Sequence, residues 1–187
     1  MSPVLYTVRS RFTDPAREEE WNAWYIRHLE KLMAVPGFIA AQRFSSKETV
    51  DERPYLAMYQ VASPDVFTSE AYLSIWGFDD WRPLIDNWTR DIFEPSHGAD
   101  LDFATPRDGS LRAAFASGDD DAVAAGLAEL SAQRPALRGA VVTGLDRSCT
   151  AVAWERVADR GDAEDLPEPA GVTLVQAVYA PITECLR

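Results

Sequence analysis

Lysine is almost absent from this chain of 187 residues, and Lys31 and Lys47 are its only two. Arginine supplies the remaining positive charge, and the 18 basic residues face 30 acidic ones, giving a formal net charge of −12. Nucleic acids and anionic lipid surfaces attract proteins with basic surfaces. The charge balance therefore argues against both, and we expect neither a nucleic-acid nor a membrane partner.

Cysteine and long apolar runs are also scarce. The two cysteines, Cys149 and Cys185, are far apart and match no metal-binding spacing, which is typical of free thiols in a reducing compartment. No apolar run approaches the ~20 residues that span a bilayer, and the first residues lack the basic segment and apolar core of a secretory signal. We therefore expect a cytoplasmic protein.

The motifs of several large enzyme classes are missing. No Gly-x-Gly-x-x-Gly or P-loop pattern follows an expected strand, and no Gly-x-Ser-x-Gly nucleophile elbow occurs. The chain has two histidines, His28 and His97, too few for a convincing zinc or iron centre, and we interpret His97 as an exposed linker residue. We expect no metal and no cofactor, with haem bound through His28 as the alternative left open.

Apolar residues, in contrast, make up 47% of the chain and include six tryptophans, enough to build a core. Residues 4–12 alternate between apolar and mixed positions, which predicts a strand. Asp14-Pro15 then begins a helix that Pro36-Gly37 ends. Further expected elements are strands at 38–44 and 55–61, a helix at 66–76 and a strand at 88–94. Their order, βαββαβ, is that of the ferredoxin-like unit.

Part of the same order returns after a stretch rich in proline, glycine and aspartate at 96–109. The expected elements there are strands at 111–116, 137–145, 150–157 and 172–179, and a helix at 119–133. The second helix of the unit has no counterpart. We therefore predict an α+β protein of two tandem ferredoxin-like units, with antiparallel sheets covered by helices. The first unit is residues 1–95, the linker 96–109 and the second, degenerate unit 110–187.

The first helix carries an apolar face interrupted by one imidazole. Positions spaced as one side of a helix hold Trp21, Trp24, Tyr25, His28, Leu29 and Leu32. The ordinary pKa of histidine, near 6.5, allows proton transfer close to neutral pH. His28 is therefore either a satisfied core histidine or a catalytic or ligand-binding group.

These residues resemble a known family. The run from Trp24-Tyr25 through His28-Leu29 to Val35-Pro36-Gly37-Phe38 and Arg43-Phe44 is similar to the dimeric α/β-barrel superfamily, in particular its EthD-like members. Tyr55-Leu56-Ala57-Met58-Tyr59 and the start of a helix at Ser69 to Tyr72 resemble the elements that follow, so the likeness covers about residues 4–95. It implies a homodimer and a small-molecule ligand. The superfamily is diverse in chemistry, and the likeness leaves open whether the barrel closes within one chain or between two.

Aromatic residues concentrate in the first half of the chain, so we expect the site there, between the helices and the sheet. The predicted catalytic residues are His28, Tyr25 and Arg43. His28 takes a proton from a carbon beside a carbonyl or from a phenol. Tyr25 or Tyr59 holds the resulting oxyanion, and Arg9 or Arg43 adds positive charge. The predicted substrate-binding residues are Arg9, Trp21, Trp24, Tyr59, Tyr72 and Trp76. Large flat side chains with a few polar groups suit an aromatic or cyclic molecule.

The sequence thus predicts a cofactor-independent enzyme of small-molecule metabolism. The expected reaction is of the isomerase, lyase or dehydratase, cyclase or monooxygenase type, on an aromatic or cyclic carbonyl compound, with proton transfer by His28. The alternative is a ligand-binding or oligomer-forming barrel without catalysis, in which the aromatic residues of the helix are core or interface. The two differ in whether His28 faces a cavity with a second polar group or is sealed in the core against a backbone carbonyl.

Overall fold

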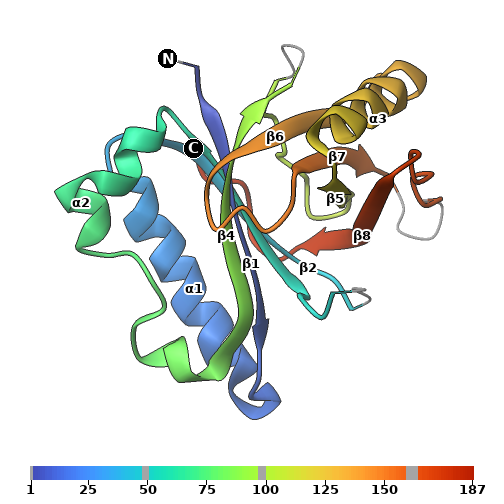
Figure 1. The fold of residues 1–187 in the computed structure, drawn as a ribbon. Helices are drawn as coiled ribbons and strands as arrows, with labels where there is room; N and C mark the ends of the chain where they lie inside the picture. Colours follow the sequence, from blue (N-terminus) through green and yellow to red (C-terminus); the bar gives the residue numbers. More distant parts are fainter. Residues whose placement is uncertain (1, 48–50, 97–99, 159–163) are drawn as a thin grey trace.

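The computed structural model describes residues 2–47, 51–96, 100–158 and 164–187. Eight antiparallel strands form a closed barrel in the order β1-β3-β2-β8-β5-β7-β6-β4 (Figure 1). The strands are β1 (Val4–Phe12), β2 (Phe38–Ser45), β3 (Tyr55–Val61), β4 (Ile85–Pro95), β5 (Ser110–Gly118), β6 (Arg138–Leu145), β7 (Ala151–Val157) and β8 (Val172–Pro181). The barrel therefore closes within one chain, which answers a question that the sequence left open.

The two halves of the chain contribute four neighbouring strands each. Their orders are β4-β1-β3-β2 and β8-β5-β7-β6, so corresponding strands occupy corresponding places. One join is the β4–β6 ladder, which runs from Asp91 opposite Leu145 to Pro95 opposite Ala140. The other, between β2 and β8, pairs only Phe44 and Ser45 with Pro181 and Ala180.

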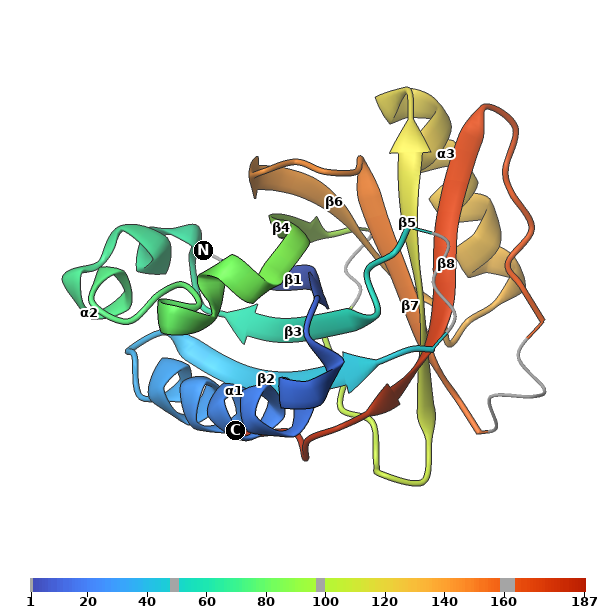
Figure 2. The same ribbon diagram turned by 90° about the horizontal axis from the view of Figure 1, so that it is seen from below.

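Helices cover two opposite sides of this barrel (Figures 1 and 2). The α-helices are α1 (Glu18–Met33), α2 (Glu70–Leu73) and α3 (Asp120–Gln133), and the 3-10 helices are η1 (Pro15–Arg17), η2 (Pro64–Thr68) and η3 (Asp79–Leu84). The prediction of a single helix at 66–76 is wrong. The chain instead turns at Ser69, whose extended backbone ends η2 and whose hydroxyl accepts from the backbone N–H of Tyr72 to begin α2.

The start of β2 depends on a glycine. Gly37 follows α1 with φ at +104°, and a Cβ at this position would overlap Cγ2 of Val66. Both the left-handed backbone and the close approach of η2 therefore require glycine. This turn directs β2 back along α1 and fixes the space between them.

Side chains fill the barrel. Because neighbours along a strand point to opposite faces, Leu5 and Arg9 point into the barrel while Tyr6 and Val8 point toward α1. The interior core takes buried residues from both halves, among them Leu5, Phe44, Met58, Phe93, Leu111, Phe115, Val152, Trp154 and Tyr179. The cavity that His28 borders therefore lies outside the barrel, under α1.

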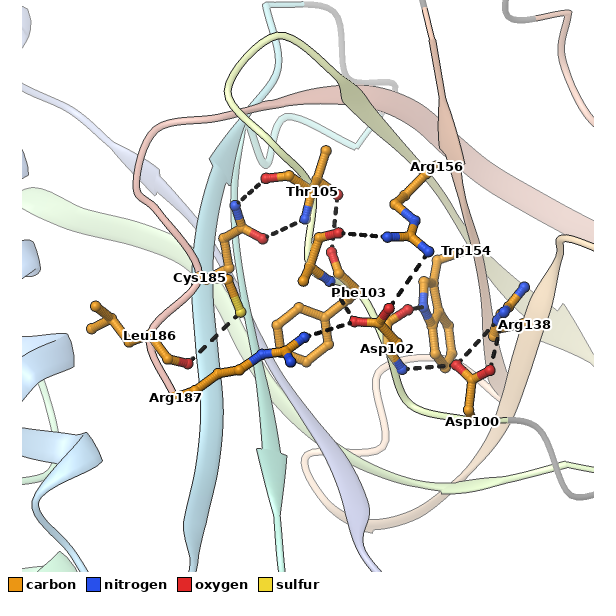
Figure 3. Close-up of polar contacts among 12 residues, drawn as sticks. Asp100, Asp102, Phe103, Thr105, Arg138, Trp154, Arg156, Cys185, Leu186 and Arg187 are labelled. Atoms are coloured by element: carbon orange, nitrogen blue, oxygen red, sulfur yellow. Dashed lines mark hydrogen bonds and ion pairs between the residues drawn. The ribbon is translucent and has the colours of Figure 1, made fainter.

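Part of the expected linker belongs to this core. Leu101 and Phe103 are buried against the barrel interior, and the indole N–H of Trp154 donates to the carbonyl oxygen of Asp102 over 3.2 Å (Figure 3). Arg138 pairs with Asp100 at 3.0 Å beside them. The segment that joins the two halves is thus packed and hydrogen-bonded from residue 100 onward.

Two further expectations concern the whole chain. Cys149, which is buried, and Cys185, which is half-buried, are both free thiols. Within the described ranges, no helix has the length and apolar character needed to cross a membrane. His97 lies outside the described residues.

Candidate functional site

A small cavity lies between α1, the segment from α2 to η3, and the outward face of β1, β3 and β4. Its volume is about 30 Å³. Its walls are mostly aromatic with polar groups from six side chains. The lining residues are Tyr6, Val8, Tyr25, His28, Leu32, Tyr59, Tyr72, Trp76, Gly77, Phe78, Trp88 and Arg90.

Strand register and helix periodicity bring these residues together. Tyr6 on β1 lies opposite Tyr59 on β3, and Val8 lies opposite Arg90 on β4, so all four share the outward face. Tyr25 and His28 are three residues apart on α1, so their side chains lie on the same side of the helix and point at this face of the sheet. The site is therefore built on regular elements on both sides.

His28 borders the cavity with an imidazole that is 7% exposed. Its ring stacks on Trp24, with centroids 4.8 Å apart, and meets the edge of Tyr25. Burial lowers the pKa of His28 to about 4; the carboxylate of Asp79 opposes this shift, and the ammonium of Lys31 adds to it. The imidazole is therefore neutral at neutral pH.

The hydrogen bonding of His28 bears on the two roles that the sequence allowed. Among the described residues, no side chain or backbone carbonyl is hydrogen-bonded to its ring. It also borders a cavity that contains other polar groups. This arrangement is not that of a core histidine sealed against a backbone carbonyl.

Four tyrosines supply hydroxyl groups around the cavity. Tyr25 and Tyr59 shift each other's pKa, and the hydroxyl oxygens of Tyr6 and Tyr72 are 3.5 Å apart. Burial is the main cause that raises the pKa of all four phenols. They therefore remain protonated at neutral pH and can donate hydrogen bonds to an oxygen that gains negative charge.

The structure places Arg43 outside this cavity. The Arg43 guanidinium is fully buried beneath α1, 4.2 Å from the ring centroids of Trp21 and Tyr25 and 4.6 Å from that of Tyr55. One of its nitrogens donates to Asn22 over 2.6 Å. Burial lowers its pKa to about 10, so it stays charged at neutral pH. Arg43 thus joins β2 to α1 and packs against the ring of Tyr25.

Arg9 and Trp21 also lie away from the cavity. Arg9 points into the barrel, where it pairs with Asp51 at 2.7 Å, donates to Ser148 and covers the ring of Phe115. The sheet therefore separates it from His28. Trp21 is fully buried and stacks on Phe12, with centroids 4.6 Å apart. Trp24, in contrast, is half-buried and forms the surface against which His28 stacks.

Of the predicted site residues, the cavity brings together Tyr25, His28, Tyr59, Tyr72 and Trp76. Sequence reasoning missed Tyr6 and Arg90. The alternation of the first strand places Tyr6 on its packed face, and this was a usable signal. Arg90 had none, because its outward direction depends on the register of β4 against β1.

The cavity beside His28, about 30 Å³ in volume as it stands, does not hold a porphyrin in this arrangement. In the part of the chain that the structure describes, no group of three or more His, Cys, Asp or Glu side chains could hold a metal ion.

Comparisons with known proteins give structural matches. No family model matches the chain, and no curated protein matches its sequence. An anthrone oxidase-like protein aligns with a TM-score of 0.65 at 12% identity, covering 98% of this chain and 92% of the other. A protein provisionally named a monooxygenase from Fusobacterium nucleatum aligns with a TM-score of 0.60 at 10% identity, covering 97% and 93%.

A third similar structure is a mutant chlorite dismutase from Candidatus Nitrospira defluvii in complex with cyanide. It aligns with a TM-score of 0.57 at 7% identity, covering 96% of this chain and 91% of the other. At such identities the likeness concerns the fold alone. The matches span both halves of the chain, so they include the whole barrel and not only the first half.

Proposed function

We propose that this protein is an enzyme that transfers a proton on an aromatic or cyclic carbonyl compound, with His28 as the base and no cofactor. One observation carries the proposal. A neutral imidazole without a hydrogen-bond partner among the described residues borders a cavity that four protonated phenols surround. The names of the similar structures, which include an oxidase-like protein and a monooxygenase, support a small-molecule enzyme of this fold.

In the proposed step, His28 takes the proton from a carbon beside the substrate carbonyl. The electron pair of the broken C–H bond moves toward the carbonyl oxygen, which becomes an enolate oxygen. The hydroxyls of Tyr59 and Tyr6 donate hydrogen bonds to that oxygen from the barrel side of the cavity. These bonds stabilise its negative charge. Return of the proton to another carbon of the substrate completes an isomerisation, and loss of a leaving group instead completes an elimination.

The low pKa of His28 restricts the substrate. An imidazole whose conjugate acid has a pKa of about 4 is a weak base, so the C–H or O–H bond that it opens must be acidic. Carbons between a carbonyl and an aromatic ring meet this condition. We therefore favour a ketone fused to an aromatic ring over a simple aliphatic ketone.

The substrate needs more room than the cavity now offers. Trp76 is 42% exposed, and Gly77 beside it has φ at +106° with no atom within 4 Å of a Cβ built on it. The backbone at this point is therefore unpacked. We propose that the Trp76–Gly77 segment moves outward to admit the substrate between α2 and η3.

Four wider proposals go with this one. The equal strand order of the two halves supports an origin as two ferredoxin-like units, 1–95 and 110–187, and the helix face with its histidine supports an EthD-like relationship. The free cysteines support a cytoplasmic location.

A homodimer remains a prediction, and because β2–β8 and β4–β6 already close the barrel, such a dimer would use the outer surface.

Proton exchange tests the proposal without knowledge of the natural substrate. The protein is incubated in D₂O with 2-tetralone and with 2-indanone, and deuterium incorporation at the carbon between the carbonyl and the aromatic ring is followed by NMR. We expect exchange above the buffer rate in the wild type and its loss in His28→Gln. The matched control, Arg27→Gln, changes an exposed residue of the same helix and should exchange normally. Binding of these ketones without exchange would favour the non-catalytic alternative.

A further inference from the structure

Arg90 is the one cationic side chain among the residues that line the cavity. It projects from the middle of β4, opposite Val8, and so points to the face that carries Tyr6 and Tyr59. Its guanidinium carbon lies 4.9 Å from the ring centroid of Trp76 and 5.1 Å from that of Trp88. The positive charge is therefore held between two indoles at the side of the cavity.

The hydrogen-bonding capacity of Arg90 is only partly used. One terminal nitrogen lies 3.6 Å from a carboxylate oxygen of Asp146. Burial raises the pKa of the nearby Tyr72 phenol, and the positive charge of Arg90 opposes this shift. The other oxygen of the Asp146 carboxylate accepts the backbone N–H of Arg90 over 2.7 Å. The Nε atom of Arg90 is buried without a partner among the described residues. A buried donor that lacks an acceptor destabilises a folded protein, so this one is suited to a ligand oxygen.

We infer that Arg90 selects ligands with a carboxylate on a flat ring system, a specificity that rests on the proposed small-molecule function of this cavity. Nε and a terminal nitrogen of a guanidinium form a planar pair of donors whose spacing matches the two oxygens of a carboxylate. The indoles of Trp76 and Trp88 flank that group and offer flat apolar surface to the ring. The hydroxyl of Tyr72 provides a further donor on the same side.

Negative charges near the cavity make direct contact with Arg90 necessary for an anionic ligand. Asp146 lies beside Arg90, the charge of Asp79 acts on His28, and the chain carries a net charge of −12. An anionic ligand is repelled by these charges unless it contacts a cation directly. Arg90 is placed for that contact, so its removal should affect anionic ligands and leave neutral ones of the same shape nearly unchanged.

Calorimetric titration with 2-naphthoate and its neutral counterpart 2-naphthamide tests the inference. We expect the wild type to bind the acid about 10- to 100-fold more tightly than the amide, the range for hydrogen bonds to charged groups. Arg90→Gln should abolish this preference, and Arg90→Lys, which keeps charge but not the planar pair of donors, should retain only part of it.

Arg82→Gln is the matched control. Arg82 also stacks on Trp88, at 5.1 Å, but it does not line the cavity, so its replacement should keep the preference for the acid. Equal affinity for acid and amide in the wild type, a preference that survives in Arg90→Gln, or no binding of 2-naphthoate at millimolar concentration would each overturn the inference. If Arg90→Gln does not fold, the acid–amide comparison in the wild type still decides.

The titration involves no turnover, so its outcome is separate from that of the exchange experiment. A protein that binds 2-naphthoate through Arg90 and exchanges no proton would refute the proposed function and leave this specificity standing. A protein that exchanges protons on ketones and binds acid and amide equally would do the reverse.

Discussion

The imidazole of His28 lies nearly parallel to the indole of Trp24, with 13° between their planes and 4.8 Å between their centroids. The two residues are one helical turn apart on α1, and the edge of Tyr25 meets the imidazole from the side. Stacking fixes the plane of the ring without occupying either nitrogen. The proton-accepting atom is thus oriented by aromatic contacts alone, which leaves it available to a ligand.

Replacement of His28 separates a catalytic from a structural role. His28→Ala removes a stacked ring but leaves no hydrogen-bond partner behind, because none is found among the described residues. We expect a loss of about 1–2 kcal/mol in the free energy of unfolding and a fall in exchange rate of about 10²- to 10⁴-fold, as for loss of a general base. Circular-dichroism melting and exchange should be measured on one sample. Early melting with a normal rate per folded molecule would end the case for His28 as the base.

Stability should depend on pH through His28. The pKa is about 4 in the folded protein and about 6.5 in the unfolded chain, so between these values only the unfolded chain binds the proton. The free energy of unfolding therefore rises with pH in this window, and the contribution is fully present above pH ~6.5 and lost toward pH ~4. The difference between the two pKa values corresponds to about 3 kcal/mol.

Urea unfolding of the wild type and His28→Gln across this window isolates the effect, since the carboxylates titrate in both proteins. The stability difference between them should shift by about 3 kcal/mol in favour of the wild type as pH rises. A difference that stays constant with pH would show that burial does not depress this pKa.

Arg43 provides a contrast, because its guanidinium contacts the rings of Trp21, Tyr25 and Tyr55 and does not reach the cavity. Arg43→Ala should destabilise the protein by about 3 kcal/mol or more, by removing a desolvated cation–π cage and leaving a void. Activity per folded molecule should change little. A variant that melts like the wild type but loses exchange would instead give Arg43 the charge-stabilising role that the sequence suggested.

Gly37 tests how the turn after α1 is held. Gly37→Ala introduces a side chain at φ +104° and against Val66, and we expect a loss of about 1–3 kcal/mol in chemical denaturation. In a Val66→Ala background the overlap is relieved but the backbone strain remains. The penalty for Gly37→Ala should therefore shrink there without vanishing, and an unchanged penalty would assign all of it to the backbone.

Most elements of this fold could be predicted from the sequence, because strand alternation and proline or glycine boundaries are local signals. The strands at 4–12 and 55–61 and the long helix ending at Met33 agree with the structure. The helix expected at 66–76 failed because the preference of Ser69 for capping outweighed the apolar pattern around it. The closure of the barrel could not be predicted, since it depends on ladders between residues as distant as Ser45 and Ala180.

The candidate site was predictable to the extent that it follows one helix face and strand alternation. His28, Tyr25 and Tyr59 came from such patterns, and they meet at the cavity. Arg9 and Arg43 were assigned by charge alone. Their actual positions, inside the barrel and under α1, depend on which strand face each occupies and on three-dimensional packing.

The pH profile of proton exchange tests the central claim most directly. Exchange of 2-tetralone is followed from below pH ~4 to above pH ~7, in the wild type and in His28→Gln. A neutral base with a pKa of about 4 predicts a rate that rises through that value and is flat across neutral pH, and this dependence should be absent from His28→Gln. An inflection near pH ~6.5, the ordinary pKa of histidine, or a profile unchanged in His28→Gln would contradict the account.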